Sequence, residues 1–358
     1  MRFYIYGSTE TTNNRIGMLR KVLNMEKIKY YGGGGKSNKP SKIFDLIKLF
    51  FCDTLYMGPF SHSNIRIMKM AKLLRKKVIV DYYASYFDMN VVDRKMFLPE
   101  SDKGQQQLFV DRMAADLADQ LMFLNHAECD YYLSATDCIE HKNKACIVPL
   151  VIEDRQKASL SYYKDHDGVF NIVFCGTYIP LHGIQVIIDA IDILAQNHSN
   201  FHLYLWGNKN TVQASSKYRY QVKERELGGY ITFINDWDKE NYYTWCVDNC
   251  ALMLGVFGES EKAYTVVPNK VVDALAFGIP CITGESKGCR EFFDGKNDVL
   301  IVSHTAKALA DAISNFMEDN YLNIAKRVDL TEGIYEKYFS EKAFAENIKK
   351  LILNFLKK

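Results

Sequence analysis

The sequence predicts an α/β protein in which two Rossmann-like, doubly wound domains face a central cleft. A chain of 358 residues is longer than one hydrophobic core usually supports. Short apolar strand patterns alternate along it with amphipathic helix patterns, which is typical of a parallel sheet covered by helices on both faces. The alternation starts afresh at Val169, so we expect the second half to repeat the architecture of the first.

The first half opens with a strand pattern at residues 2–6, followed by a polar loop and a helix from about Asn14. Further strands are predicted at 27–31, 54–58, 77–83, 120–125 and 143–154, and helices at 64–75, 104–119 and from Lys42.

Polar residues follow two of these strands. Ligands of parallel sheets lie beyond the carboxyl ends of the strands. We therefore expect the acceptor cleft of the first domain to be lined by Asn14, Arg15, Asp81, Tyr83 and Asp88. The alternative is a polar loop with aromatic side chains packed beneath it.

The second half reads as strands at 169–176, 202–207, 230–234, 251–255, 279–283 and 298–302, with helices between them. The tail carries an apolar stripe that needs a sheet or a neighbouring domain to cover it, formed by Phe344, Ile348, Leu351, Ile352 and Phe355. We expect a first domain at 1–153, a second at 154–335, and a final helix at 336–358 that packs back toward the first domain.

The helix between Pro268 and Gly278 has well-marked ends, because proline suits a first helical turn and glycine ends a helix. Its polar face gathers Asn269, Lys270 and Asp273 at the helix N-terminus, where free backbone N–H groups and the helix dipole favour an anion. The alternative is an ordinary surface helix in which Lys270 and Asp273 form an ion pair.

Three segments of the second half converge on one sheet edge: Gly176–Gly183, Gly207–Lys209 and Glu261–Asp273. Glycines allow close approach of the backbone to a ligand, so a diphosphate could sit here. We expect positive charge from His182, Lys209, Lys262 and Lys270, and hydrogen bonds from a ribose to Asp273. The alternatives are a tight turn at Gly176 and an ordinary loop histidine at His182.

Three stretches carry a family resemblance: FCGTYIPLHGIQVIIDAIDIL, GVFGESEKAYTVVPNKVVDALAFGIPCIT and KGCREFF. They resemble the C-terminal half of the family-four, GT-B-fold retaining glycosyltransferases, over most of residues 169–320. In the first half, DRMAADLADQLMFLN and KACIVPLVIED are similar to the helix and strand that lead into the family's domain linker. The resemblance implies a nucleotide-sugar donor in the second domain and a glycan or lipid-linked glycan acceptor in the first.

The resemblance also implies roles for single residues. It matches Gly176, Thr177, His182 and Gly183 to the glycine-rich donor loop, Asn269 and Lys270 to the diphosphate and sugar contacts, and Asp273 to the ribose-binding acid. We expect Lys270 and His182 at the catalytic centre, and from the converging segments we add Lys209, Glu261 and Lys262 to the donor-binding residues. The family usually has an arginine near Thr177, a lysine at the position of His182 and a glutamate at that of Thr265. We infer that Lys270, with Lys262 or Lys209, replaces the usual charge on the diphosphate.

The reaction implied is sugar transfer with retention, in which cations and helix-end amides stabilise the departing diphosphate. It needs no metal and no cofactor beyond the nucleotide sugar. A metal-dependent GT-A enzyme would use one of the DxD strings, Asp165–Asp167 or Asp236–Asp238, but the first precedes a strand and the second is expected to cap a helix. Two other functions remain open: an epimerase of the nucleotide sugar, and a catalytically inactive partner subunit.

Composition narrows the class of protein. Hydrophobic residues at 48% and charged residues at 25% are typical of globular proteins, and 45 basic against 43 acidic residues give no support for a nucleic-acid partner. The nine scattered cysteines indicate buried thiols in a reducing compartment, and Cys246 with Cys250 favours core packing over zinc because no second ligand pair stands nearby.

We expect a cytoplasmic protein, because the opening RFYIYG follows a strand pattern and no run of about 18 apolar residues occurs. Two basic amphipathic segments, 43–51 and 66–77, suggest peripheral contact with an anionic membrane surface, as suits an enzyme of bacterial surface polysaccharide synthesis. The alternative is that both helices pack on the sheet and show lysines to water.

Overall fold

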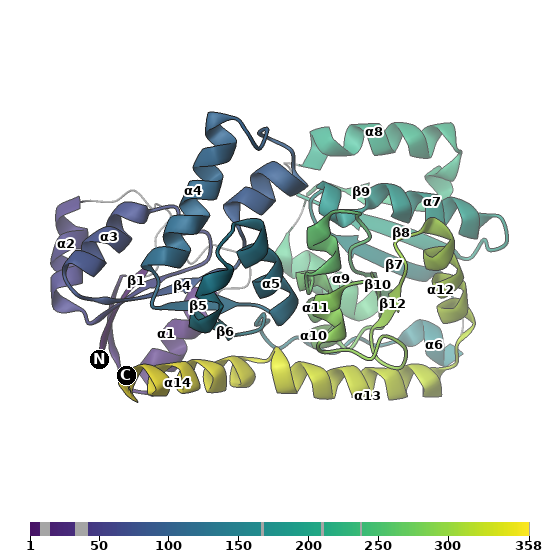
Figure 1. The fold of residues 1–358 in the computed structure, drawn as a ribbon. Helices are drawn as coiled ribbons and strands as arrows, with labels where there is room; N and C mark the ends of the chain where they lie inside the picture. The colour runs from purple at the N-terminus through teal and green to yellow at the C-terminus, as the bar shows by residue number, and fades with distance from the viewer. Residues whose placement is uncertain (8–14, 33–41, 166–167, 209–210, 237, 358) are drawn as a thin grey trace. The chain divides into compact units, whose positions relative to one another are not determined.

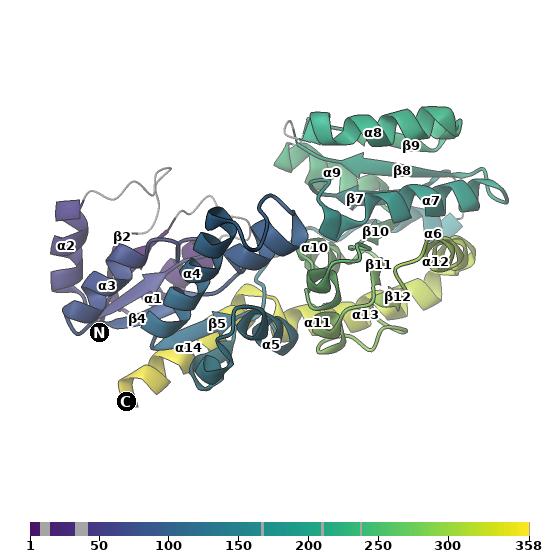
Figure 2. The same cartoon turned by 45° about the horizontal axis from the view of Figure 1, so that its top comes forward.

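The computed structural model describes residues 1–7, 15–32, 42–165, 168–208, 211–236 and 238–357 (Figures 1 and 2). It divides into two compact units. Unit 1 comprises Met1–Ile152 with Tyr338–Lys358, and unit 2 comprises Glu153–Lys337. Each unit is a mixed α/β structure around one six-stranded parallel sheet, as the alternating patterns predict.

The sheet of unit 1 has the strand order β2-β1-β3-β4-β5-β6. Its strands are β1 (Arg2–Tyr6), β2 (Lys29–Gly32), β3 (Thr54–Met57), β4 (Lys77–Asp81), β5 (Gln120–Phe123) and β6 (Ala145–Ile147). The chain moves outward in one direction from β1 to β2 and in the other from β3 onward. The switch point of this sheet therefore lies between β1 and β3. Ligands of such folds usually bind at the switch point.

Side chains alternate between the two faces along each strand, and apolar side chains lie on both faces of this sheet. Helices therefore cover both faces. Phe3 and Ile5 pack in one core cluster with α1 and α14, while Tyr4 and Tyr6 belong to a cluster on the other side. The helices of the unit are α1 (Arg15–Met25), α2 (Lys42–Phe51), α3 (Ile65–Leu73), α4 (Asp102–Leu117), α5 (His126–Ala135) and α14 (Glu341–Lys357), with short helices η1 (Asp88–Asp93) and η2 (Ile139–Lys144).

The apolar stripe of the tail is covered within unit 1. Phe344, Ile348, Leu351 and Ile352 of α14 are buried in the same cluster as Phe3 and Ile5, as the sequence pattern requires. The side chain of Phe355 lies outside the described residues.

The sheet of unit 2 has the order β12-β11-β10-β7-β8-β9. Its strands are β7 (Phe170–Cys175), β8 (Phe201–Trp206), β9 (Ile231–Ile234), β10 (Leu252–Leu254), β11 (Cys281–Gly284) and β12 (Leu300–Val302). Counted within the unit, this is the 3-2-1-4-5-6 order of a Rossmann sheet. Its switch point lies between β7 and β10.

Ile172 and Phe174 of β7 pack with α7 and α12 in the largest core cluster of unit 2. The helices of the unit are α6 (Ser161–Asp165), α7 (Ile184–Ala195), α8 (Thr211–Glu224), α9 (Lys239–Asn249), α10 (Asn269–Phe277), α11 (Lys287–Arg290), α12 (Ala306–Glu318) and α13 (Tyr321–Tyr338), with short helices η3 (Pro180–His182), η4 (Leu227–Gly229) and η5 (Glu261–Tyr264). Asp238 caps α9 by accepting a hydrogen bond from the backbone N–H of Asn241, as expected for the second DxD string.

In the described part of the chain, no helix has both the length and the apolar character needed to cross a membrane. All nine cysteines are free thiols, and both Cys246 and Cys250 are buried. The described residues contain no group of three or more side chains placed to hold a metal ion.

Candidate functional site

The candidate site lies at the switch point of unit 2. The loop after β7 carries η3, and the segment after β10 carries η5 and leads into α10. The two segments pack together, with Leu181 of η3 and Ala263 of η5 in one small apolar cluster. The predicted convergence of the segments around Gly176–Gly183 and Glu261–Asp273 is therefore present.

Two glycines allow the loop after β7 to lie close to its neighbours. A Cβ atom at Gly176 would stand 3.0 Å from Cε1 of His182 and 3.5 Å from Cε of Lys270. Gly183 has φ +64°, and a Cβ atom there would lie 2.3 Å from the carbonyl carbon of Phe257. A larger residue at position 183 would be strained in conformation and would also clash with backbone.

Backbone hydrogen bonds hold this close approach. The N–H of Phe257 donates to the carbonyl oxygen of His182 at 3.2 Å, and the N–H of Gly258 donates to that of Leu181 at 3.1 Å. The position of the histidine is thus set by the main chain of both loops.

His182 is buried and its ring contacts polar groups on both sides. Nδ1 is hydrogen-bonded to the carbonyl oxygen of Thr177, and Nε2 lies 3.3 Å from Nζ of Lys270. A carbonyl only accepts, so Nδ1 carries the proton, and Nε2 accepts from the lysine ammonium. This arrangement requires a neutral imidazole. The expectation that His182 adds positive charge is therefore corrected: it orients the charge of Lys270.

Lys270 stands in the first turn of α10, with Nζ 4.9 Å from the centre of the Phe174 ring. Desolvation lowers the pKa of Lys270 to about 8, although nearby acidic groups oppose the shift. At neutral pH the amine remains largely protonated. The result is a cation with little water around it at a helix N-terminus, which favours binding of an anion.

Asp273 follows one turn later and pairs with Arg155 instead of Lys270. Oδ1 of Asp273 lies 3.7 Å from Nη2 of Arg155, while no ion pair joins Asp273 to Lys270 among the described residues. Burial raises the pKa of Asp273 to about 6, and Arg155 is the largest influence opposing that rise. The alternative of a simple surface pair between Lys270 and Asp273 is thus wrong.

No pattern in the sequence indicates a role for Arg155. Its Nη2 atom donates to the hydroxyl of Tyr243 at 2.7 Å, and the guanidinium lies 4.3 Å from the centre of that ring. Arg155 precedes the first strand of unit 2 in a stretch with no strand or helix period, so no pattern connects it to α10. Its role depends on folding of the whole unit.

The other predicted donor residues are placed less directly. Thr177 is exposed and engaged through its carbonyl oxygen, and Asn269 is the first residue of α10. Glu261 and Lys262 lie in η5. Lys209 lies outside the described residues. Thr265 is buried and its hydroxyl donates to the carbonyl oxygen of Lys262 at 3.2 Å, so this side chain is turned into its own loop.

Two residues expected in the acceptor cleft of unit 1 are instead part of its core. Arg15 and Asp81 have no exposed side-chain surface, and Nε of Arg15 lies 2.8 Å from Oδ2 of Asp81. The hydroxyl of Tyr56 donates to the same oxygen at 2.6 Å, and Arg15 also donates to the carbonyl oxygen of Pro149 at 2.7 Å. A buried pair of charges must be satisfied internally, so these side chains hold the sheet edge together.

Asp88 is likewise buried, and its Oδ1 accepts a hydrogen bond from the Tyr131 hydroxyl at 2.6 Å. Tyr83 is partly exposed and packs its ring 5.3 Å from that of Phe60. Of the five expected acceptor residues, Tyr83 alone keeps partial exposure among those described, and Asn14 lies outside the described residues.

A buried cluster that the sequence did not suggest orders the loop after β4. Nε2 of His62 lies 3.0 Å from Oδ1 of Asp111, and the Ser85 hydroxyl donates to Oδ2 at 2.6 Å. The backbone N–H groups of Tyr86 and Phe87 donate to the same carboxylate. One carboxylate on α4 therefore fixes the loop after β4 and the segment after β3 together.

Residues 169–319, which carry every contact of the unit 2 site except Arg155, match the family model described as Glycosyl transferases group 1. Among solved structures, the chain is similar to Anabaena HepE in complex with UDP and glucose, with 13% identity, 98% of each chain covered and a TM-score of 0.66. It is also similar to sucrose-phosphate synthase from Thermosynechococcus elongatus, with 14% identity, 99% of each chain covered and a TM-score of 0.72.

A glycosyltransferase from Rickettsia africae is similar as well, with 11% identity, 100% of this chain and 99% of that chain covered, and a TM-score of 0.65. A search of curated proteins finds no match. At these identities the similarity shows the fold, which is the two-domain GT-B fold of glycosyltransferases.

Proposed function

We propose that this chain, a GT-B-fold protein whose residues 169–319 match glycosyl transferases group 1, transfers a hexosyl group from a nucleoside-diphosphate sugar to a glycan or lipid-linked glycan. The observation that carries the proposal is the contact between Nζ of Lys270 and Nε2 of His182 at 3.3 Å. Both side chains lie next to Gly176, at the switch point of unit 2. This is where a Rossmann sheet binds a nucleotide.

The proposed chemistry follows from where positive charge is available. As the bond between the sugar and the diphosphate breaks, negative charge develops on the leaving phosphate. Lys270 and the positive end of the α10 helix dipole stabilise that charge, in surroundings where desolvation strengthens the interaction. Because these groups supply the positive charge, the proposed transfer is metal-independent.

Asp273 is proposed to accept hydrogen bonds from the ribose, and Arg155 supports this role. An ionised carboxylate accepts hydroxyl donors at both of its oxygens and binds them more strongly than the protonated form, and the guanidinium 3.7 Å away favours the ionised form. The similarity to a HepE structure in complex with UDP-glucose, at 13% identity and a TM-score of 0.67, supports a nucleotide-sugar partner of the same kind.

The transfer is proposed to retain the configuration of the sugar. The acceptor hydroxyl attacks the anomeric carbon on the face that the diphosphate leaves, and the hydroxyl proton departs with the diphosphate. The bond from carbon to acceptor oxygen forms as the bond to phosphate breaks, so atoms and charge balance without a covalent sugar–enzyme bond.

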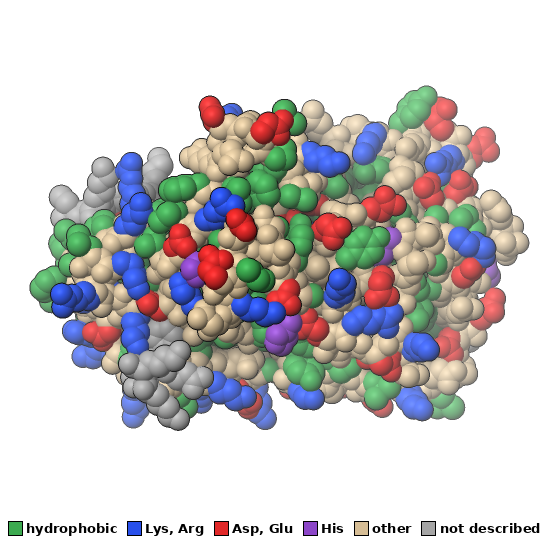
Figure 3. Space-filling view, in the orientation of Figure 1, with side chains coloured by type: hydrophobic (Ala, Val, Ile, Leu, Met, Phe, Trp, Pro, Cys, Tyr) green, Lys and Arg blue, Asp and Glu red, His purple; other side chains and the backbone are tan. Residues whose placement is uncertain are grey.

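Unit 1 presents a surface that supports peripheral membrane contact. Phe44, Ile47 and Phe51 share one face of α2 and are 64%, 48% and 51% exposed. Hydrophobic side chains gather over α2 at the left of Figure 3, with basic side chains beside them. We propose a cytoplasmic protein that contacts an anionic membrane surface and acts in bacterial surface polysaccharide synthesis.

The experiment that tests the function is a donor screen. Thermal shift against UDP, GDP, ADP and their sugars identifies the nucleotide, and turnover of the selected donor is then followed with and without glycan acceptors. Sugar transfer that requires an acceptor supports the proposal. Conversion of the nucleotide sugar without acceptor would instead indicate an epimerase, and no binding of any nucleotide would indicate an inactive partner subunit.

A further inference from the structure

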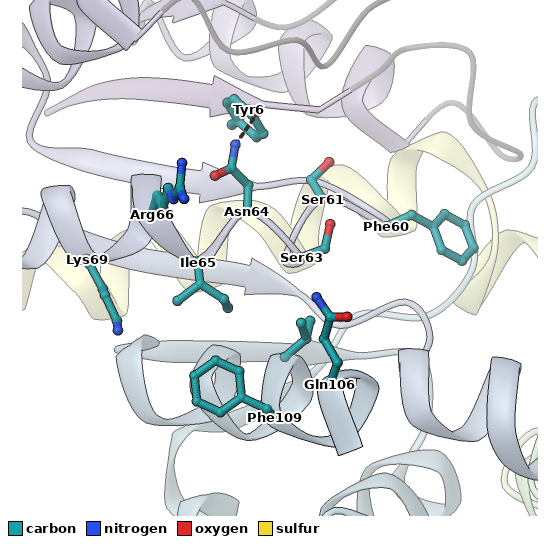
Figure 4. Close-up of a pocket in the computed structure, with 11 residues that line it drawn as sticks. Tyr6, Phe60, Ser61, Ser63, Asn64, Ile65, Arg66, Lys69, Gln106 and Phe109 are labelled. Carbon is teal, nitrogen blue, oxygen red and sulfur yellow. Dashed lines mark hydrogen bonds between the residues drawn. The ribbon is translucent and has the colours of Figure 1, made fainter. Parts of the chain in front are cut away.

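Unit 1 contains a cavity of about 670 Å³ at its own switch point, between β1 and β3 (Figure 4). Tyr6 at the end of β1, the segment Phe60–Asn64 after β3, the start of α3 and one face of α4 line it. Its volume suits a small-molecule ligand. None of the four described residues expected in the acceptor cleft, Arg15, Asp81, Tyr83 and Asp88, contributes to its lining.

The charge of the lining is positive. Arg66 and Lys69 both line the cavity from α3, and no carboxylate among the described residues does. Both side chains are exposed, and neither forms an ion pair with another described residue. Two such cations on one wall favour an anionic ligand, and a phosphate is the group that arginine and lysine bind most effectively together.

The start of α3 adds to this preference. Asn64 precedes the helix but makes no side-chain cap, and its amide instead donates to the hydroxyl of Tyr6 at 2.5 Å. The N–H of Ile65 donates to the carbonyl oxygen of Ser63 at 3.0 Å, and Asn64 caps none of the other N–H groups of the first turn. The first turn of α3 lies at the same wall of the cavity as Arg66. The helix N-terminus and the arginine side chain therefore favour an anion at the same place.

The remaining lining is apolar. Ile65 of α3, Phe109 and Val110 of α4, and Phe60 line the cavity, and Phe109 is 53% exposed. Figure 4 shows Gln106 and Phe109 of α4 opposite Ser63 and Ile65. A lining that combines cations with apolar side chains suits a ligand with an apolar part next to its charge.

The segment after β3 is held in a strained conformation at Phe60, at the rim of this cavity. Phe60 has φ +57°, which is unfavourable for a bulky residue. Its carbonyl oxygen accepts a hydrogen bond from the Tyr86 hydroxyl, and the neighbouring His62 is buried against Asp111. Strain that is fixed by a buried network beside a cavity is typical of a ligand site.

We infer that this cavity binds an amphiphile in which a phosphate adjoins an apolar chain. Phosphate would meet Arg66, Lys69 and the first turn of α3, and the chain would lie against Phe60 and Phe109. Only the further identification of this amphiphile as the lipid-linked acceptor rests on the proposed function. Membrane phospholipids also combine a phosphate with an apolar chain. The test therefore distinguishes a lipid-linked acceptor from a membrane phospholipid.

Binding to the full-length protein is measured by calorimetry with three probes: decyl phosphate below its micelle concentration, inorganic phosphate, and dihexanoyl phosphatidylglycerol. We expect decyl phosphate to bind at least tenfold more tightly than either of the others. If inorganic phosphate binds as tightly as decyl phosphate, the cavity does not select an amphiphile. If phosphatidylglycerol binds as tightly or more tightly, the ligand is not the acceptor lipid.

The variants are Arg66→Gln with Lys69→Gln, and Lys72→Gln as the matched control. Lys72 is on the same helix but pairs with Asp119 at 2.7 Å and does not line the cavity. Each charge-assisted hydrogen bond lost should weaken decyl phosphate binding about tenfold, so the double variant should lose about 30- to 100-fold and the control less than about twofold.

Both altered side chains are exposed, so the fold should survive, and circular dichroism checks it. A double variant that binds within threefold of the wild type would overturn the site. Nucleotide binding is recorded on the same samples. If decyl phosphate binds as expected and no nucleotide binds, the proposed amphiphile site is supported and the proposed transferase function is contradicted.

Discussion

Nζ of Lys270 lies 3.3 Å from Nε2 of His182, and the opposite nitrogen of that ring is held by the carbonyl oxygen of Thr177. The main chain of the loop after β7 thereby fixes the tautomer of the histidine, and the histidine fixes the direction of the ammonium. A cation aimed in advance at the place where a phosphate leaves needs no reorganisation during the reaction.

Lys270→Met should make the protein more stable while removing its activity. A partly buried cation whose pKa desolvation has lowered to about 8 destabilises the folded state at neutral pH, and methionine fills a similar volume without charge. We expect a melting temperature at pH 7 that is about 2 °C higher or more. Calorimetric melting and donor turnover, measured on one preparation, separate lost chemistry from lost folding.

The same shift predicts a stability change with pH. Between about pH 8 and 10.5 the unfolded chain binds a proton at Lys270 that the folded chain has lost, so stability gains a favourable contribution as pH rises through this window. In Lys270→Met that contribution disappears. Wild type and variant melting curves that stay parallel from pH 7.5 to 10.5 would contradict the assigned environment of Lys270.

Donor use should have a bell-shaped pH dependence. Ribose binding requires ionised Asp273, whose pKa is raised to about 6, and diphosphate binding requires protonated Lys270, whose pKa is lowered to about 8. We expect kcat/KM for the donor to fall below about pH 6 and above about pH 8. Initial rates at limiting donor measure both limbs.

Arg155→Met should move the acidic limb of that profile to higher pH, because the guanidinium is the largest influence that keeps Asp273 ionised. The basic limb should remain in place. Arg225→Met is a control, since Arg225 pairs with Asp189 on the surface of the same unit. An acidic limb that does not move would show that Asp273 is not the group that titrates.

Gly183→Ala should destabilise unit 2 by about 3 kcal/mol, because it combines left-handed backbone strain with a contact of 2.3 Å to backbone. Gly228→Ala is the matched control, since a Cβ atom there meets nothing within 4 Å. Urea denaturation of the two variants gives the comparison. A change of less than 0.5 kcal/mol at Gly183, the range of ordinary surface substitutions, would contradict the close approach of the two loops.

Membrane contact should depend on the apolar face of α2. Phe44→Ser with Phe51→Ser should reduce co-sedimentation with anionic vesicles at low salt, whereas Leu322→Ser, an exposed leucine of unit 2, should not. Zwitterionic vesicles should bind less in every case. If the double variant sediments like the wild type, α2 is not the contact surface.

Much of the fold follows from local patterns. Alternating strands such as Arg2–Tyr6 and apolar strands such as Phe170–Cys175 were predicted within about two residues, because parallel strands bury both faces. The helix His126–Ala135 was not predicted. It has almost no amphipathic period, and its start depends on Asn125, whose side chain accepts from the backbone N–H of Glu128.

The sequence predicts the arrangement of the site in unit 2 better than that of the acceptor cleft in unit 1. Gly176, His182 and Lys270 were brought together correctly because their segments follow neighbouring strands of one sheet. Arg155 could not be found, since its contacts depend on the folded position of an unpatterned segment. Arg15 and Asp81 were misassigned because sequence does not distinguish a charge buried with its partner from one that faces a ligand.

The central claim is that Lys270 binds the diphosphate of the donor, and one calorimetric titration tests it most directly. UDP, or the nucleotide selected by the donor screen, is titrated into wild type, Lys270→Gln and Lys307→Gln, the last an exposed lysine of unit 2 paired with Asp311. We predict at least tenfold weaker binding for Lys270→Gln and unchanged binding for Lys307→Gln. Equal affinity of all three proteins would contradict the account.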